Sequence, residues 1–132
     1  MNIELIPLQK HGDERGMLIA LENAKNIPFD IKRVYYMFGT QSDVRRGYHA
    51  HKNLRQLAIP ISGSCRFHLD NGIEKVDVLL DDPALGLLIE PTMWHEMYDY
   101  SSNCILLVLA SDIYDESDYI RNYDDFIASV KI

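Results

Sequence analysis

Arg45-Arg46-Gly47-Tyr48-His49-Ala50-His51-Lys52 is the stretch from which the fold of this chain can best be interpreted. Its two histidines are two positions apart, and side chains with this spacing share one face of an extended strand. A helix would separate them, and Gly47 disfavours a helix as well. Imidazole has an ordinary pKa close to neutrality, so it suits proton transfer or metal binding. We therefore predict a strand that directs both imidazoles into one cavity, with Arg45 or Arg46 near its entrance. A solvated histidine pair on a strand edge is the alternative.

The segments around this stretch are typical of short strands. Apolar, β-branched and aromatic residues alternate with polar ones or form short runs bounded by turn residues. Asn71-Gly72 is a strong hairpin signal. The spacing of apolar residues over 118–127 predicts one helix near the C-terminus, while 10–16 is interpreted as a polar turn and Pro91 to His95 as a proline turn. The predicted strands are 3–8, 17–22, 31–38, 54–61, 64–70, 73–80, 85–90 and 103–110.

This order of elements predicts an all-β fold, a small antiparallel sandwich or barrel with a short C-terminal helix. A fold of this kind holds a ligand between its two sheets. Its 132 residues fit a single domain, residues 1–132, with one core. We expect Cys65 and Cys104 to be buried free thiols in a reducing cytoplasm, because their spacing is not that of a zinc site.

The composition and the net charge limit the kinds of partner that the chain is expected to bind. The net charge of −7 argues against nucleic-acid binding, since phosphate neutralisation needs a basic surface. The chain contains no apolar run as long as a membrane span, and its first residues do not resemble a signal peptide. The cationic residues cluster between 33 and 55, and much of the acid lies in the last third. This separation predicts a positive mouth for a small phosphorylated ligand on an acidic body.

Two further segments contribute candidate site residues. Arg33 and Tyr35 share one face of the predicted strand 31–38, where they line a polar pocket or belong to an edge strand with Arg33 in water. His95 follows Trp94, the only tryptophan of the chain. The indole is expected either to stack on a ligand or to fill the core. Arg15 lies in the first turn and matters only if the fold brings it to the histidines.

The histidine pair followed by a later histidine resembles the cupin superfamily. Many cupins bind a metal through two histidines, a glutamate and a third histidine. Here the glutamate position is Gln56, a weak neutral ligand, so the charge complement for a divalent ion is reduced. We therefore favour a metal-free site. A three-histidine metal site made by His49, His51 and His95 is the alternative, and a metal-dependent dioxygenase would be its functional counterpart.

Within the cupin superfamily, the chain resembles the sugar nucleotide 3,4-ketoisomerases, which act on dTDP-4-dehydro-6-deoxy-glucose. The resemblance covers nearly the whole chain and is carried by 13–16, 31–36, 46–52, 94–97, 109–112 and 114–121. It implies a cupin jelly roll, a homodimer, no cofactor and no metal. It also implies a part in making dTDP-3-amino-3,6-dideoxy sugars for surface polysaccharides such as O-antigen or S-layer glycans. By the same resemblance His49 is the acid/base residue, with His51 and Tyr35 close to the sugar.

The chemistry of such a reaction suits these residues. Moving a ketone from C4 to C3 requires removal of the C3 proton, which one neutral imidazole can perform, with a pH limb near neutrality. Arg33, Tyr35 or His51 can donate hydrogen bonds to the developing enolate oxygen. Arginines such as Arg46 suit the diphosphate. The predicted substrate-binding set is Arg15, Arg33, Arg46, Lys52 and Trp94.

The stereochemistry at C4 depends on which face of the enediol receives the proton. Arg15 and His95 resemble the branch of the family that makes the galacto product, which predicts dTDP-3-dehydro-6-deoxy-galactose with His95 as a second protonating residue. The alternatives are the gluco product, a 3,5-epimerase of the same architecture, and a non-catalytic cupin that binds a sugar nucleotide. The epimerase typically pairs its base histidine with an aspartate and uses a tyrosine acid, an arrangement without a clear match in the sequence.

Overall fold

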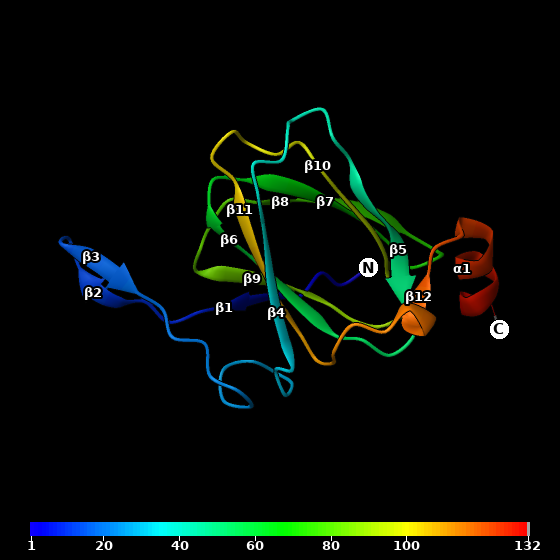
Figure 1. The fold of residues 1–132 in the computed structure, drawn as a ribbon, viewed down its shortest axis with the longest axis horizontal. Helices are drawn as coiled ribbons and strands as arrows, with labels where there is room; N and C mark the ends of the chain where they lie inside the picture. Colours follow the sequence, from blue (N-terminus) through cyan, green and yellow to red (C-terminus); the bar gives the residue numbers. More distant parts are fainter. Residues whose placement is uncertain (132) are drawn as a thin grey trace.

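A computed structural model describes residues 1–131, which form two five-stranded antiparallel sheets facing each other (Figure 1). The first sheet has the order β1-β9-β6-β11-β4 and the second β12-β5-β10-β7-β8, while β2 and β3 form a separate hairpin. The strands are β1 (Leu5–Pro7), β2 (His11–Asp13), β3 (Gly16–Leu18), β4 (Arg33–Phe38), β5 (Arg46–His51), β6 (Gln56–Ser62), β7 (Cys65–Asp70), β8 (Lys75–Leu80), β9 (Leu85–Ile89), β10 (Trp94–Tyr98), β11 (Ile105–Ala110) and β12 (Tyr119–Ile120). A 3-10 turn, η1 (Glu116–Asp118), precedes β12, and α1 (Tyr123–Val130) is the C-terminal helix.

The predicted all-β jelly-roll architecture is confirmed, with one qualification. The two sheets remain separate hydrogen-bonded ladders among residues 1–131, so they form a sandwich and not a closed barrel. No helix among these residues has the length and apolarity needed to cross a bilayer.

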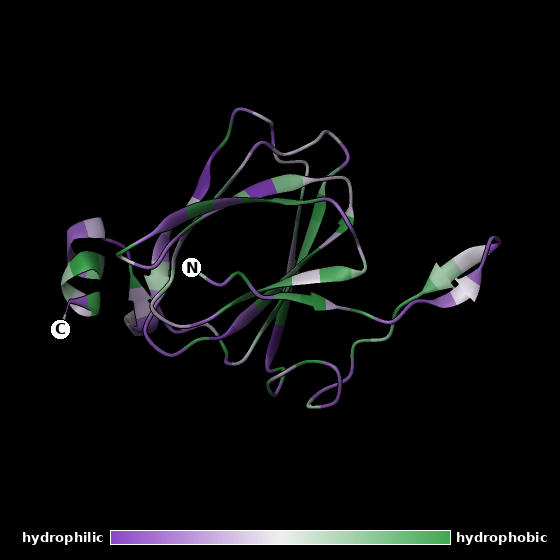
Figure 2. Ribbon diagram, turned by 180° about the vertical axis from the view of Figure 1, so that it is seen from behind, coloured by the Kyte–Doolittle hydropathy of each residue, from purple (hydrophilic) through white to green (hydrophobic). Residues whose placement is uncertain are grey.

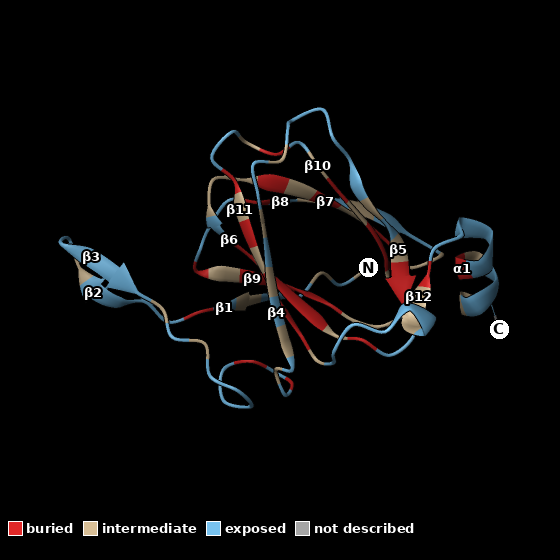
Figure 3. Cartoon of the chain, in the orientation of Figure 1, coloured by how far each residue is buried: buried red, intermediate tan, exposed pale blue. Residues whose placement is uncertain are grey.

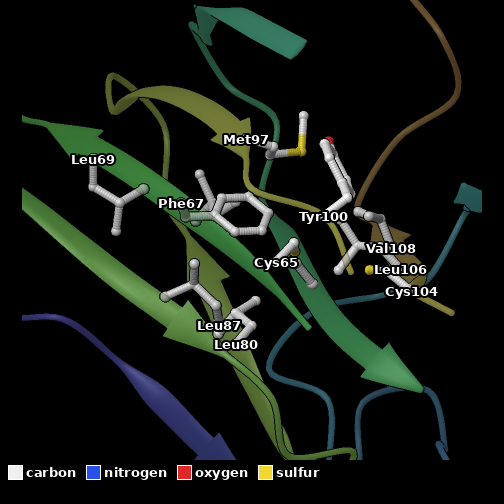
Figure 4. Packing of buried hydrophobic residues seen from close by; sticks show 12 residues of the cluster. Cys65, Phe67, Leu69, Leu80, Leu87, Met97, Tyr100, Cys104, Leu106 and Val108 are labelled. Atoms are coloured by element: carbon white, nitrogen blue, oxygen red, sulfur yellow. The ribbon is translucent and has the colours of Figure 1, made fainter. Parts of the chain in front are cut away.

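The main core lies between the sheets. On β7, Cys65, Phe67 and Leu69 point inward, while Arg66 and His68 alternate onto the outer face, as predicted. The inward residues meet Leu87 of β9 and side chains of β11, and Figure 4 shows this packing with both cysteines in it. The thiols are free and buried, which confirms that expectation. Buried residues, red in Figure 3, occur in strands of both sheets. Period-2 alternation in the sequence therefore determines which residues meet.

A second cluster covers the outer face of the first sheet. Ile27 and Phe29, from the loop that precedes β4, pack on Leu57 and Ile59 of β6. Strand β6 is thus buried on both faces. This is the physical reason that its inward phase cannot be read from its sequence, since both sets of alternate residues are apolar.

Three predicted elements need correction. Residues 10–16 are not a simple turn, because they belong to the β2–β3 hairpin, an arm that projects from the sandwich (Figures 1 and 2). The proline turn ends at Met93, and the next five residues form β10 in the middle of the second sheet. That strand was missed because its ladders on both sides are with distant segments, β5 and β7.

The C-terminal helix begins later than predicted, at Tyr123. Asn122 caps it by accepting the backbone N–H of Asp125, as an asparagine at the N-cap commonly does. Tyr119 and Ile120, which the helical spacing had included, pair instead with β5. The helix packs Phe126 against the outer face of the second sheet. This correction places Tyr119 beside the histidines.

Candidate active site

Three histidines meet where β5 lies beside β10. His49 and His95 are directly opposite each other in the antiparallel register. The ring centroid of His49 lies 4.6 Å from that of His95 and 5.1 Å from that of His51. His51 and His95 are buried and His49 is half-buried. The structure therefore brings together all three histidines that the sequence singled out.

A β-bulge with a glycine makes this approach possible. The register between β10 and β5 shifts between His95 and Glu96, opposite Gly47. Gly47 has a φ of +95°, and a Cβ at this position would lie 2.7 Å from the carbonyl oxygen of His95. Only glycine tolerates both the positive φ and the close contact without strain. Gly47 therefore fixes how closely the two histidine strands approach.

The hydrogen bonds of the rings define their tautomers. Nδ1 of His49 lies 3.0 Å from the carbonyl oxygen of Gly47, and Nδ1 of His95 lies 3.1 Å from that of Met93. A carbonyl oxygen only accepts, so each neutral ring carries its proton on Nδ1. The lone pair on Nε2 of each ring is then available to take a proton.

Burial keeps these imidazoles neutral. It is the largest cause that lowers the pKa of His49, of His51 to about 4, and of His95 to about 3. The charge of the neighbouring histidine adds to the effect on His51 and His95. A neutral imidazole near pH 7 is a base ready to accept a proton.

A cavity of about 290 Å³ opens between the two sheets at the histidine cluster. Part of its lining is apolar and includes Met37, Phe67 and Met97, and the rest is polar. This combination is typical of small-molecule sites. The polar side chains of the lining are Arg33, Tyr35, Arg46, His49, Gln56, His95 and Tyr119.

Strands β4 and β6 supply the hydrogen-bonding side of the cavity. The Tyr35 hydroxyl accepts a hydrogen bond from Nε2 of Gln56 at 2.8 Å, and burial raises the pKa of Tyr35 to about 12. The phenol therefore stays protonated and can donate to a ligand oxygen. The Arg33 guanidinium lies 5.3 Å from the Tyr35 ring, and its buried Nε has no hydrogen-bond partner among residues 1–131. Arg33 and Tyr35 thus line the pocket that their shared strand face predicted.

The structure also shows which of the two candidate arginines lies at the cavity. Arg46 lines the cavity, whereas Arg45 pairs with Glu96 at 2.7 Å and lies over the ring of Tyr98. The sequence alone did not show which of the two arginines faces the cavity. Alternation along the strand and the ion pair between Arg45 and Glu96 of β10 distinguish them.

The three histidines are also the one group among residues 1–131 that could hold a metal ion. A ring nitrogen of each lies within 4.8 Å of the other two. The fourth polar position is the neutral amide of Gln56, which is already bonded to Tyr35. A divalent ion would thus lack the carboxylate that completes such a site.

Tyr119 is a site residue that sequence reasoning missed. Its ring centroid lies 5.0 Å from that of His49 and 4.3 Å from that of His51, and it lines the cavity. On its other side lies the guanidinium of Arg121, 4.2 Å from the ring centroid, which also pairs with Glu116. The signal in the sequence was the stretch 114–121, which contributed to the family resemblance, but the helical spacing of the apolar residues obscured the role of Tyr119.

Four of the predicted site residues do not line this cavity. His51 lines a smaller neighbouring pocket instead, together with Arg33 and Tyr119. Arg15 is on the projecting arm, where its side chain is 85 % exposed and pairs with Asp13. Lys52 is exposed beyond the end of β5. Trp94 is buried against Phe126 of α1, because alternation along β10 turns it away from His95. Of the two roles expected for the indole, filling the core is the one that its position supports.

Comparison with known proteins identifies the family. Residues 1–131 match the family model described as FdtA: WxcM-like, C-terminal. A curated TDP-4-oxo-6-deoxy-alpha-D-glucose-3,4-oxoisomerase from Aneurinibacillus thermoaerophilus is 53 % identical over 126 residues, which cover 96 % of this chain and 91 % of the relative.

Solved structures of 3,4-ketoisomerases are also similar to this chain. The 3,4-ketoisomerase QdtA from Thermoanaerobacterium thermosaccharolyticum, a histidine-to-asparagine mutant in complex with TDP-4-keto-6-deoxyglucose, is 46 % identical with a TM-score of 0.95, covering 98 % of this chain and 94 % of that one. A 3,4-ketoisomerase from Helicobacter canadensis is 47 % identical with a TM-score of 0.93, covering 98 % of both chains. The chain therefore belongs to the family of sugar nucleotide 3,4-ketoisomerases.

Proposed function

We propose that this chain isomerises TDP-4-keto-6-deoxyglucose by moving the keto group from C4 to C3. The observation that carries the proposal is the neutral imidazole of His49, whose Nδ1 is engaged with the Gly47 carbonyl and whose Nε2 is free beside the cavity. The names of the relatives support the substrate. The product would serve the synthesis of dTDP-3-amino-3,6-dideoxy sugars for surface polysaccharides.

The reaction follows from the residues that line the cavity. His49 takes the C3 proton on Nε2, and the electron pair of the C3–H bond forms the C3–C4 double bond while the C4 carbonyl oxygen becomes an enolate. Tyr35 and Arg33 donate hydrogen bonds to that oxygen, which then takes the proton from the His49 imidazolium to complete the enediol. A neutral ring nitrogen of the histidine cluster takes the proton of the C3 hydroxyl and delivers it to C4, which gives the C3 ketone. His51 lies behind His49 and stabilises its charge.

No metal or coenzyme is needed in this scheme, since the base, the hydrogen-bond donors and the acidified C–H bond supply all its steps. We expect EDTA to leave activity unchanged. Arg46 at the cavity entrance would bind the diphosphate through bidentate hydrogen bonds from its planar guanidinium.

We propose the galacto configuration for the product. The His95 ring lies 4.6 Å from that of His49, so its Nε2 is available to take the proton that the C3 hydroxyl loses and to deliver it to C4 from a different direction. Replacing His95 by glutamine should shift the product away from galacto, as read by proton NMR coupling constants at C4. An unchanged galacto product from this variant would refute the assignment.

We further propose that residues 1–132 act as one cupin-type domain in the cytoplasm, as a homodimer. The outer face of β4 exposes Val34, Tyr36 and Phe38, and the arm exposes Met17 and Leu18. A second copy seated on these apolar side chains would bury them. It would also give Arg15 on the arm a way to reach a cavity, that of the partner.

The direct test is incubation with TDP-4-keto-6-deoxyglucose in deuterium oxide with EDTA. We expect a C3 ketone with solvent deuterium at C4, and a His49→Asn variant that still binds TDP but has lost roughly 10²- to 10⁴-fold in kcat. His68→Asn is the matched control, since His68 pairs with Asp77 on the outer face of β7. A product without deuterium at C4 would indicate direct hydride migration, and an active His49→Asn variant would exclude His49 as the base.

A 3,5-epimerase is the second candidate, and one observation favours it. Nδ1 of His51 lies 3.3 Å from a carboxylate oxygen of Asp118, and Tyr35 is a protonated phenol in the same cavity. The same deuterium experiment separates the two reactions. Epimerisation would leave the ketone at C4 and introduce deuterium at C3 and C5.

A further inference from the structure

Asp118 connects the histidine cluster with the segment that follows β5. Its carboxylate is mostly buried, with 14 % of the side chain exposed. Oδ1 accepts the backbone N–H of Asn53 at 2.9 Å and Oδ2 accepts that of Leu54 at 3.2 Å. Oδ2 also lies 3.3 Å from Nδ1 of His51. One side chain thus accepts hydrogen bonds from the loop and lies beside the His51 ring.

The position of this carboxylate bears on the tautomer of His51. An ionised carboxylate only accepts hydrogen bonds, so it favours a proton on the nearer nitrogen, Nδ1. The contact is too poorly aligned to be a well-formed hydrogen bond, and neither ring nitrogen of His51 has another partner among residues 1–131. Among residues 1–131, Asp118 is therefore the anionic group near enough to select between the two neutral forms.

We propose that Asp118 is a positioning residue that keeps His51 in the Nδ1–H tautomer, so that the lone pair on Nε2 is available to the histidine cluster. The proposal rests on the isomerase function, because it matters when His49 becomes a cation. A lone pair on the neighbouring ring stabilises that cation, whereas an N–H pointed at it repels it. Ring nitrogens of the two histidines lie within 4.8 Å of each other, close enough for this effect.

Tyr119 strengthens the arrangement. It follows Asp118 directly, pairs with His51 in the β12–β5 ladder, and packs its ring against those of both His49 and His51. The packing of Tyr119 thereby restricts the position of the His51 ring. Asp118 then decides the location of its proton, since the packing alone does not distinguish the two nitrogens.

The decisive variant is Asp118→Asn. The amide keeps one acceptor oxygen for the loop N–H groups and presents an NH₂ group toward Nδ1 of His51. That donor favours the opposite tautomer, with the proton on Nε2. We expect kcat to fall about 10- to 100-fold, as for carboxylates that orient functional histidines from behind, while KM for the sugar nucleotide changes less than threefold.

The matched control is Asp115→Asn. Asp115 lies three residues upstream and also caps backbone, by accepting the N–H and hydroxyl of Ser117, but it is not in contact with His51. We expect this variant to keep the kcat of the wild type.

Nitrogen-15 NMR of the imidazoles provides a readout that a purely structural role would not move. In the wild-type protein, with the His51 signals assigned by a His51→Gln variant, we expect the shifts of a protonated Nδ1 and a bare Nε2. Asp118→Asn should move these signals toward the Nε2–H form, and Asp115→Asn should not.

Three outcomes would overturn the proposal. They are a wild-type His51 with its proton on Nε2, an Asp118→Asn variant with wild-type kcat, and a slow Asp118→Asn variant whose His51 signals are unchanged, since Asp118 would then act only through the loop. The nitrogen-15 measurement on wild-type His51 tests the proposal even if the Asp118→Asn variant does not fold. It also separates this proposal from the isomerase function, whose failure would appear as an inactive wild-type protein.

Discussion

At the scale of single residues, the chemistry depends on keeping imidazoles neutral inside the sandwich. His51 and His95 each keep only 3 % of their surface exposed, so the charged forms lose most of their hydration. Backbone carbonyls then determine which nitrogen of His49 and His95 bears the proton. Burial and these carbonyl contacts together turn ordinary histidines into oriented bases.

The pH dependence of kcat/KM should reflect this burial. The base must be neutral, so activity falls as the pH drops through the pKa of His49 in the free enzyme. Burial lowers that pKa below its ordinary value of 6.5, so the acid limb should lie below pH 6.5 and the rate should be flat from pH 7 to 8. The sequence alone predicted a limb near neutrality. A limb above pH 7 in steady-state assays would contradict the assignment.

Stability should also depend on pH through His95. Its folded pKa of about 3 is below the unfolded value of 6.5, so the unfolded state binds more protons between these values and stability is lost as the pH falls. One such group contributes a slope of up to about 1.4 kcal/mol per pH unit.

A His95→Gln variant tests this slope. Urea unfolding at fixed protein concentration should show that the wild type loses about 2 kcal/mol more than the variant between pH 7 and pH 5. Equal losses in the two proteins would mean that His95 is not held neutral by the fold.

At the scale of elements, the β5–β10 pair with its bulge builds the site. The bulge lets the strands change register after His95, opposite Gly47, so that the histidines stay face to face. The sheets contribute opposite walls, with β4 and β6 supplying Tyr35 and Gln56. Strand positions, more than loops, hold these groups in place.

Gly47→Ala should therefore damage catalysis beyond its effect on stability. Alanine would be strained at a φ of +95°, and its Cβ would meet the His95 carbonyl oxygen at 2.7 Å, so β5 and β10 must separate. We expect kcat to fall on the order of 10²-fold, as for a displacement of about 1 Å in other sites.

Gly39→Ala is the control for this change. Gly39 also has a positive φ, +67°, but nothing lies within 4 Å of the added Cβ. Both variants should lose roughly 1–3 kcal/mol from backbone strain in urea unfolding. Only Gly47→Ala should lose kcat, and equal kcat in the two variants would contradict the role of the bulge.

At the scale of the whole molecule, apolar surface is left uncovered on one side. The outer face of β4 and the arm expose large apolar side chains, while α1 covers the opposite sheet through Phe126. The arm itself has little contact with the sandwich in Figures 1 and 3. A second copy of the chain is the occupant that we propose for this surface.

The homodimer can be tested by light scattering after size exclusion. The wild type should have twice the 15.2 kDa mass of one chain. Tyr36→Glu, at a position 63 % exposed on β4, should dissociate it because a buried unpaired charge is costly. Ile73→Glu, at a turn position 90 % exposed, should not. A monomeric wild type at micromolar concentration would exclude this interface.

The sequence by itself determined much of the architecture. Alternation along 64–70 and the Asn71-Gly72 turn predicted the β7–β8 hairpin, since period 2 and turn chemistry are local properties, although β8 begins at Lys75 and not at Ile73. The histidine spacing predicted the shared face of His49 and His51. The shared strand face predicted Arg33 and Tyr35 at a pocket, and the family resemblance indicated Tyr35 and His95.

Only the tertiary structure decided the rest, because those features depend on partners distant in the chain. Strand β10 exists through ladders with β5 and β7, and Tyr119 joins the site through pairing with His51, against its own helical spacing. The position of Asp118 behind His51 joins residues 67 positions apart. Local sequence encodes which face a side chain takes, whereas packing between strands decides what that face meets.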